Sequence, residues 1–266
     1  MKRELDTRDT IRVVTSNNFL RAAGLEKTTL KARKLLYVAL SQCQMNDRNF
    51  FEYSISAVDF ANLMGIDPSH VWGEADELTD ELMHGFIKYM PPGKKNFEKF
   101  QLFKMCKYED SVLHFELSED MTPVMLNLKQ DFTQPLLKDF MHMRSNYSIE
   151  IWHLMQKEMQ SKKPGTDKIE FYISLEELRK ITGTQNKLKQ LGEFKNRVLD
   201  KALREIKDNC GTVITYKNRK QGRSVVGFDF TATSEFDMSD YVPSPELLEK
   251  IEQGKQRIQE AKDRIE

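Results

Sequence analysis

The amino-acid sequence predicts an α+β fold in which one arrangement of helices and strands occurs twice and a short helical tail follows. Two stretches share the same order of strand-like, capping and helical residues, and each has similar neighbours. Net charge also differs sharply between the two halves of the 266-residue chain. We expect a first domain over residues 1–134, a second over residues 135–233 and an acidic tail over residues 234–266.

The best-matched part of the repeat is a capped helix, at residues 52–65 and again at residues 170–183. Each copy has a β-rich stretch, a serine, an amphipathic helical segment and a glycine. A serine is a good N-cap because its hydroxyl accepts a hydrogen bond from a free backbone N–H of the first helical turn. A glycine ends a helix well because it adopts positive φ without strain. Both copies therefore predict a strand followed by a short helix.

The neighbours of this helix repeat as well. An apolar stripe at helical spacing precedes each copy, at residues 35–43 and 151–159. A third helix follows each glycine, and two strand-like runs around a polar turn follow the third helix. We expect the third helices at residues 74–89 and 194–208, and the strand pairs at 97–107 with 112–117 and at 212–216 with 225–230. This order is that of a winged helix, a helix-turn-helix with a β-hairpin wing. The fold class is therefore two tandem winged-helix domains.

The connecting and terminal segments are less regular. A linker is expected over residues 121–134, which Pro123 and Pro135 bracket. In the tail, Ile251, Ile258 and Ile265 lie seven residues apart, which favours a solvated helix or a weak interaction arm.

Charge is divided unevenly along the chain although the totals cancel, with 41 Lys and Arg against 41 Asp and Glu. The net charge is −3 over residues 1–135, +7 over 136–233 and −4 over 234–266. Residues 185–223 hold eleven basic and four acidic side chains, whereas residues 49–87 hold eight acidic side chains and no Lys or Arg. A basic surface neutralises phosphates and releases their counterions, and an acidic surface repels them. We therefore expect the second domain to contact double-stranded DNA.

The third helix and the wing of the second domain supply the candidate contacts. With Val198 at the centre of the buried stripe, a regular helix points Asn196, Arg197 and Asp200 outward, and Arg204 and Lys207 with them. Lys195 falls nearer the apolar side but within reach of a phosphate. Asn pairs well with adenine and Arg with guanine, whereas a basic wing follows the phosphate backbone. The predicted DNA-binding residues are Lys195, Asn196, Arg197, Lys201, Arg204, Lys207, Lys217, Arg219, Lys220 and Arg223.

The first domain has the opposite charge at the equivalent places. Its third helix carries five acidic residues and no basic residue before Lys88, and Glu109 and Asp110 occupy its wing tip. Carboxylates facing phosphates would be repelled, so we expect this helix not to read bases. Lys94 and Lys95 remain available for a peripheral phosphate contact. Protein contacts, and self-association into a homodimer above all, are the expected role of this domain.

Five segments together resemble one known family, the plasmid replication initiators with tandem winged-helix domains of the iteron-controlled type. In the first domain the similar segments are residues 14–20 and 34–42. In the second domain, residues 145–154 resemble the family's helix opening, residues 192–206 its principal DNA-reading helix and residues 222–230 its closing strand. The resemblance covers about residues 11–233. The acidic third helix of the first domain departs from it.

The resemblance implies a protein that binds direct repeats at a plasmid origin. It implies that the protein helps to open a neighbouring AT-rich segment and recruits the host initiator and helicase. It also implies a dimer, joined through the first domain, that represses its own gene at an inverted repeat, and a monomer that binds the direct repeats.

Two alternative functions are those of a rolling-circle nicking enzyme and of a plain transcriptional repressor. A rolling-circle nicking enzyme would need a His-x-His metal site, and no two of His70, His84, His114, His142 and His153 are separated by a single residue. No phosphate-cradling glycine-rich motif is present either, so we expect no enzyme activity, no metal and no cofactor. A plain transcriptional repressor stays open, because repression and initiation share one DNA-binding surface. Without a long apolar run or an apolar leader, a bacterial cytoplasmic location and no membrane contact are expected.

Overall fold

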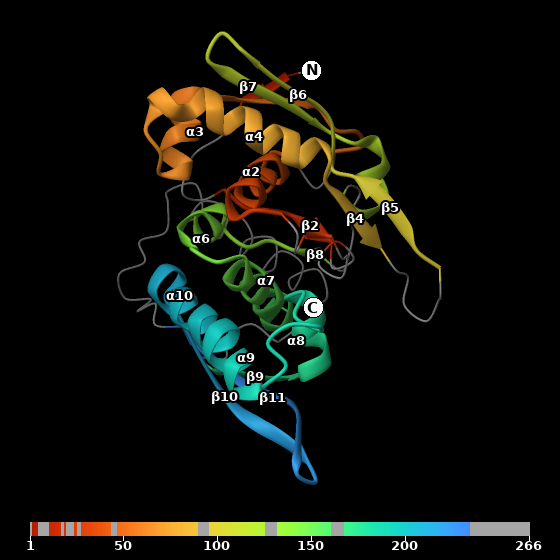
Figure 1. Cartoon of the computed structure of the whole chain (residues 1–266), viewed down its shortest axis with the longest axis vertical. Coiled ribbons are helices and arrows are strands. Elements are labelled where there is room, and N and C mark those ends of the chain that lie inside the picture. The colour runs from red at the N-terminus through yellow and green to blue at the C-terminus, as the bar shows by residue number, and fades with distance from the viewer. Residues whose placement is uncertain are drawn as a thin grey trace, which may run out of the picture. The chain divides into compact units, whose positions relative to one another are not determined.

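A computed structural model of the protein describes residues 2–4, 11–16, 19, 24, 25, 28–43, 47–89, 96–125, 132–160 and 168–234 (Figure 1). The described residues belong to one compact unit. The predicted helical tail lies outside the described residues, as do Lys94 and Lys95.

The first winged helix follows the predicted order of elements. Its helices are α2 (Leu30–Ser41), α3 (Ala57–Met64), the 3₁₀ turn η2 (Pro68–His70) and α4 (Val71–Met83). Its main sheet has the order β1-β3-β7-β6, from β1 (Lys2–Glu4), β3 (Glu52–Ser56), β6 (Phe103–Glu109) and β7 (Val112–Leu117). A separate ladder pairs β4 (Phe86–Tyr89) with β5 (Glu98–Gln101). In Figure 1 this ladder lies at one end of the main sheet.

The second winged helix repeats the same order. Its helices are α7 (Asn146–Gln160), α8 (Leu175–Ile181), α9 (Leu191–Phe194), the π turn η4 (Lys195–Leu199) and α10 (Asp200–Cys210). Its sheet has the order β10-β11-β9, from β9 (Lys168–Ser174), β10 (Thr212–Gln221) and β11 (Ser224–Ser234). The prediction of two tandem winged-helix domains is confirmed.

The two predicted caps are present. The Ser56 hydroxyl accepts a hydrogen bond from the backbone N–H of Asp59, and the Ser174 hydroxyl accepts one from that of Glu177. Gly65 ends α3 at φ 66°, and Gly183 follows α8 at φ 62°. These local signals set the position of the second helix in each domain.

The third helix of the first domain is shorter than predicted. It ends at Met83, and residues 86–89 form a strand instead of a last helical turn. Gly85 lies between the end of α4 and the start of β4, where an added Cβ would meet the Leu102 side chain at 2.9 Å. The prediction was wrong because the apolar residues of β4 fit helical spacing too, and only pairing with β5 favours the strand.

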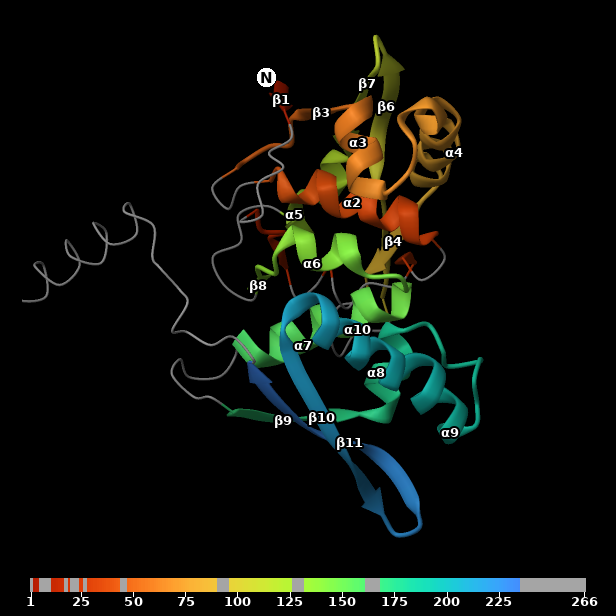
Figure 2. The same cartoon turned by 90° about the vertical axis from the view of Figure 1, so that its left-hand side faces the viewer.

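The wing of the second domain is longer than predicted. Residues 217–221 and 224 belong to strands, and only Gly222 and Arg223 form the turn, with Gly222 at φ 61°. Strand residues 217–221 are polar, so they show no alternation of apolar side chains that would predict a strand. Backbone pairing with β11 forms the strand. Lys217, Arg219 and Lys220 therefore lie on β10. In Figure 2 the β10–β11 hairpin extends well beyond α9.

A short segment joins the two winged helices. It contains η3 (Glu119–Met121), α5 (Thr122–Met125), β8 (Phe132–Thr133) and α6 (Leu137–His142), and β8 pairs with β2 (Thr15–Ser16). The proposed boundary between residues 134 and 135 stays a prediction.

Buried contacts tie α2 to α7 across this segment. Arg33 on α2 is fully buried and pairs with Glu150 on α7. The Tyr37 ring stacks on Phe140 at 4.4 Å between ring centroids, and its hydroxyl lies 3.2 Å from Nδ1 of the buried His153. Neither charge of the buried Arg33–Glu150 pair can be left alone in the core. The charge pair and the aromatic stack therefore fix how α2 packs against α6 and α7.

Candidate nucleic-acid interface

The DNA-reading helix expected at residues 194–208 is one continuous helix formed by α9, η4 and α10. Its inner face is buried, with Phe194, Val198, Leu199, Ala202 and Ile206 at 0% exposure. It ends at Gly211, which takes φ 60°. Its exposed side chains include five of the predicted contacts, which are Asn196, Arg197, Lys201, Arg204 and Lys207.

Within this helix, Lys195–Leu199 form a π turn. A regular helix directs Asp200 outward, and in the structure this side chain is half-buried beside the wing. The Tyr216 hydroxyl on β10 donates a hydrogen bond to Asp200 Oδ1 at 2.6 Å.

Tyr216 also contacts the helix through Lys195. The Lys195 ammonium lies 5.1 Å from the Tyr216 ring centroid, within cation–π range. Burial, and then the hydrogen bond to the Asp200 carboxylate, raises the pKa of the Tyr216 hydroxyl. The first wing strand and the reading helix are thus joined by two polar contacts with one tyrosine.

The strand β10 places two basic wing residues on one face. Successive side chains alternate up to the register shift between Arg219 and Lys220, so Tyr216 and Asn218 share the face that meets the helix. Lys217 and Arg219 occupy the other face of the same strand. The structure therefore places Lys217 and Arg219 on the outer side, Lys220 beyond the register shift, and Arg223 in the turn between the strands.

Arg219 is held on that outer face by two partners. Its Nε donates to Asp229 Oδ2 at 3.1 Å, and its terminal nitrogen pairs with the second carboxylate oxygen. The guanidinium lies 4.4 Å from the centroid of the Tyr172 ring on β9. The hydrogen bond to Asp229 raises the pKa of Arg219. Sequence reasoning missed Asp229, Tyr172 and Tyr216 as supporting residues, because only strand register brings them beside the basic side chains.

Arg197 has an internal partner as well. Its guanidinium lies 3.0 Å from Glu193, one helical turn earlier, and both side chains are exposed. An exposed pair of this kind contributes about 0–1 kcal/mol, so a base edge or a phosphate can replace the glutamate at little cost.

The corresponding surface of the first domain is acidic. On α4, Asp76, Glu77 and Asp80 are exposed, whereas Glu74 pairs with Lys31 at 2.6 Å and Glu81 accepts from the Thr29 hydroxyl at 2.8 Å. This helix has no Lys or Arg. That it does not read bases stays a prediction.

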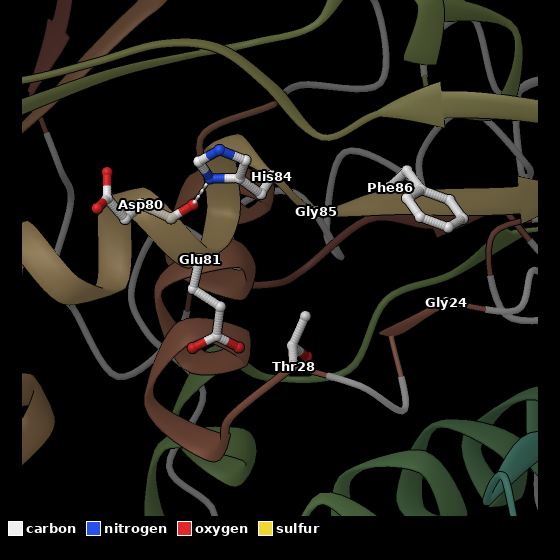
Figure 3. Close-up of a pocket in the computed structure, with 7 residues that line it drawn as sticks. All are labelled: Gly24, Thr28, Asp80, Glu81, His84, Gly85 and Phe86. Carbon is white, nitrogen blue, oxygen red and sulfur yellow. Dashed lines mark hydrogen bonds between the residues drawn. The ribbon is translucent and has the colours of Figure 1, made fainter.

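A pocket of about 350 Å³ adjoins α4 (Figure 3). Its lining residues are Gly24, Thr28, Asp80, Glu81, His84, Gly85 and Phe86. His84 Nδ1 donates to the Asp80 carbonyl at 2.7 Å, so this imidazole is engaged with its own helix. Two carboxylates in the lining make the pocket unsuited to phosphate.

Two negative findings apply to the described part of the chain. Across residues 2–4, 11–16, 19, 24, 25, 28–43, 47–89, 96–125, 132–160 and 168–234, no group of three His, Cys, Asp or Glu side chains is arranged to hold a metal ion. In the same ranges, none of the helices combines the length and the apolar character needed to cross a bilayer.

Fold and surface together define a tandem winged-helix protein of a DNA-binding class, with its positive charge on the second module. The family model described as Initiator Replication protein, WH1 matches residues 12–156, and the model described as Initiator Rep protein, WH2 matches residues 174–232. The chain therefore belongs to this family of plasmid replication initiator proteins.

One solved structure agrees on the fold. The crystal structure of Pi initiator protein in complex with iteron DNA matches with a TM-score of 0.73 and 20% identity, covering 87% of this chain and 100% of that one. A structure of domains 2 and 3 of RctB matches with a TM-score of 0.48 and 11% identity, covering 79% of this chain and 84% of that one. No curated protein matches the chain.

Proposed function

We propose that this protein initiates plasmid replication by binding direct repeats in double-stranded DNA at the origin, through its second winged helix. One observation carries the proposal. A helix whose inner face is buried exposes a row of polar and basic side chains, and the same helix contacts a long basic wing. The exposed side chains are Asn196, Arg197, Lys201, Arg204 and Lys207. Membership of the initiator family and the fold shared with Pi initiator protein support it.

Within this surface we assign different roles to the helix and the wing. Asn196 and Arg197 carry the side chains suited to base edges in the major groove. Lys195, Lys201, Arg204 and Lys207 lie along the same helix and contact phosphates. Lys217, Arg219, Lys220 and Arg223 do so from the wing, with Arg219 exchanging Asp229 for a phosphate.

The first domain is assigned to protein contacts. Its acidic α4 disfavours DNA, and we infer that the homodimer forms through this domain and represses the protein's own gene at an inverted repeat. The monomer on the direct repeats helps to open the neighbouring AT-rich segment and recruits the host initiator and helicase. The protein acts in the bacterial cytoplasm by binding, without a cofactor and without catalysis.

Footprinting on the DNA that flanks this gene tests the proposal. Directly repeated sites should be protected, and a reagent specific for unpaired thymines should modify an adjacent AT-rich segment. Arg204→Ala should lose protection, whereas Lys107→Ala, which removes an exposed lysine from β6 of the first domain, should retain it. Protection without any unpaired thymines would reduce the function to that of a repressor, and no protected repeat would overturn the proposal.

A further inference from the structure

The small β4–β5 ladder of the first domain has two chemically different faces. Register pairs Ile87 with Phe100 on one face, where Ile87 is fully buried. The other face carries Phe86 and Lys88 from β4 and Lys99 and Gln101 from β5, and Phe97 precedes β5 at the same alternation. The inner face packs against the core, whereas the outer face is open to solvent.

The outer face exposes two aromatic rings. Phe97 is 54% exposed and Phe86 is 37% exposed, which places both among the few large apolar side chains open to solvent in the described part of the chain. Lys88 Nζ lies 4.3 Å from the Phe97 ring centroid, and Lys99 Nζ lies 4.9 Å from that of Phe86. Ammonium groups and rings therefore alternate across the ladder.

The two lysines are also direct cross-strand partners, since Lys88 pairs with Lys99. Like charges directly opposite each other destabilise a ladder, and a two-stranded ladder has little stability to spare. Among the described residues neither ammonium group is in an ion pair. Two adjacent cations favour an anionic ligand.

We propose that this outer face binds single-stranded DNA, with Phe97 and Phe86 stacking on bases and Lys88 and Lys99 contacting the phosphates between them. Duplex phosphates would satisfy the lysines but would leave the rings without partners. An unpaired strand offers π-faces and phosphates together, and stacking does not require a particular sequence. The site is separate from the direct-repeat surface and does not depend on it.

Binding of labelled oligothymidylate of about 16 nucleotides to the full chain, followed by fluorescence anisotropy, tests the proposal. Phe97→Leu keeps an apolar side chain but removes the ring, and should weaken binding about tenfold. Lys99→Gln should weaken it and make it less dependent on salt. Lys107→Gln is the matched control on β6 and should leave the affinity unchanged.

Three results would overturn the proposal. One is an oligothymidylate affinity that Phe97→Leu and Lys99→Gln leave unchanged while Arg204→Gln lowers it, since the strand would then lie on the second domain. Another is no binding of oligothymidylate by the natural chain. The third is a change of oligomeric state in Phe97→Leu at equal DNA affinity, which would assign the face to self-association. Duplex direct-repeat binding, measured on the same variants, should stay unchanged and shows that they are folded.

Discussion

The Tyr216 hydroxyl and the Asp200 carboxylate lie 2.6 Å apart, and this contact joins the first wing strand to the reading helix. The same ring supports the Lys195 ammonium at 5.1 Å. One tyrosine thus sets the relation between the two elements that we assign to DNA. A duplex must meet both at once, so their relative position decides how many contacts form together.

Tyr216→Phe should reduce DNA affinity although the hydroxyl itself contacts no DNA. Loss of one hydrogen bond to a charged group costs about 1.5–3 kcal/mol, part of which appears as a less ordered wing. We expect the direct-repeat affinity to fall several-fold with little change in its salt dependence, in titrations at several salt concentrations. Asp200→Asn, which retains an acceptor, should have a smaller effect. A reduced salt slope in Tyr216→Phe would mean that a phosphate contact had been lost instead.

Arg197→Ala should relax sequence preference at one position of the site. A good bidentate contact to a base contributes about 1–3 kcal/mol of discrimination, and the Glu193 pair is too exposed to prevent it. Lys220→Ala should weaken all sequences alike, because a wing lysine contacts the backbone. Competition between the repeat and single-base variants separates the two outcomes. Equal losses on specific and random duplex for Arg197→Ala would contradict its assignment to a base.

Asp229→Asn should strengthen binding to any duplex. The substitution removes one negative charge and releases Arg219 from its partner on the outer face of the wing. Because Arg219 exchanges Asp229 for a phosphate in the natural protein, the slope of log affinity against log salt should change little in Asp229→Asn. Arg219→Ala should flatten that slope by about 1. An unchanged slope in Arg219→Ala would leave Arg219 as a structural residue over Tyr172.

Replacing one partner of the buried pair between α2 and α7 should destabilise the protein strongly. Arg33→Met leaves the Glu150 carboxylate buried without its counter-charge, which costs about 3–5 kcal/mol in such pairs. Thermal or denaturant unfolding measures the loss. The double variant Arg33→Met with Glu150→Met should recover most of it, because no lone charge remains. Equal stability of the single and the double variant would show that the two residues are not coupled.

Asp139 makes stability depend on pH in a direction opposite to that of most carboxylates. Burial raises the pKa of this side chain to about 6, although it accepts a hydrogen bond from the Trp152 indole at 3.1 Å. The folded state therefore binds the proton more tightly than the unfolded state, whose pKa is about 3.9, and Asp139 lowers stability as the pH rises from about 4 to about 6. Asp139→Asn lacks this loss. Denaturant unfolding across that pH range should show Asp139→Asn gaining stability relative to the natural chain as the pH rises. A difference in unfolding free energy that stays constant with pH would contradict the raised pKa of Asp139.

Much of each domain could be predicted locally. Ser56 and Ser174, each with a strand before and a glycine after, predicted capped helices where the structure has them. The buried stripe around Val198 follows from helical spacing. Where the prediction was wrong, two local states were equally compatible with the residues. Residues 86–89 suit helix or strand, and the polar residues of β10 carry no apolar alternation at all.

By itself, the sequence determined that there are two winged helices, where their capped helices begin, and that positive charge belongs to the second. These properties depend on residue type and on spacing over a few residues, and both can be read from the sequence without knowledge of the fold. The tertiary structure shows in addition that Lys217 and Arg219 face away from Tyr216, that the Asp200 carboxylate accepts a hydrogen bond from Tyr216, and that Lys88 opposes Lys99 beside exposed rings. Strand register sets these neighbours, and it arises from hydrogen bonds between backbone segments, which residue type alone does not specify.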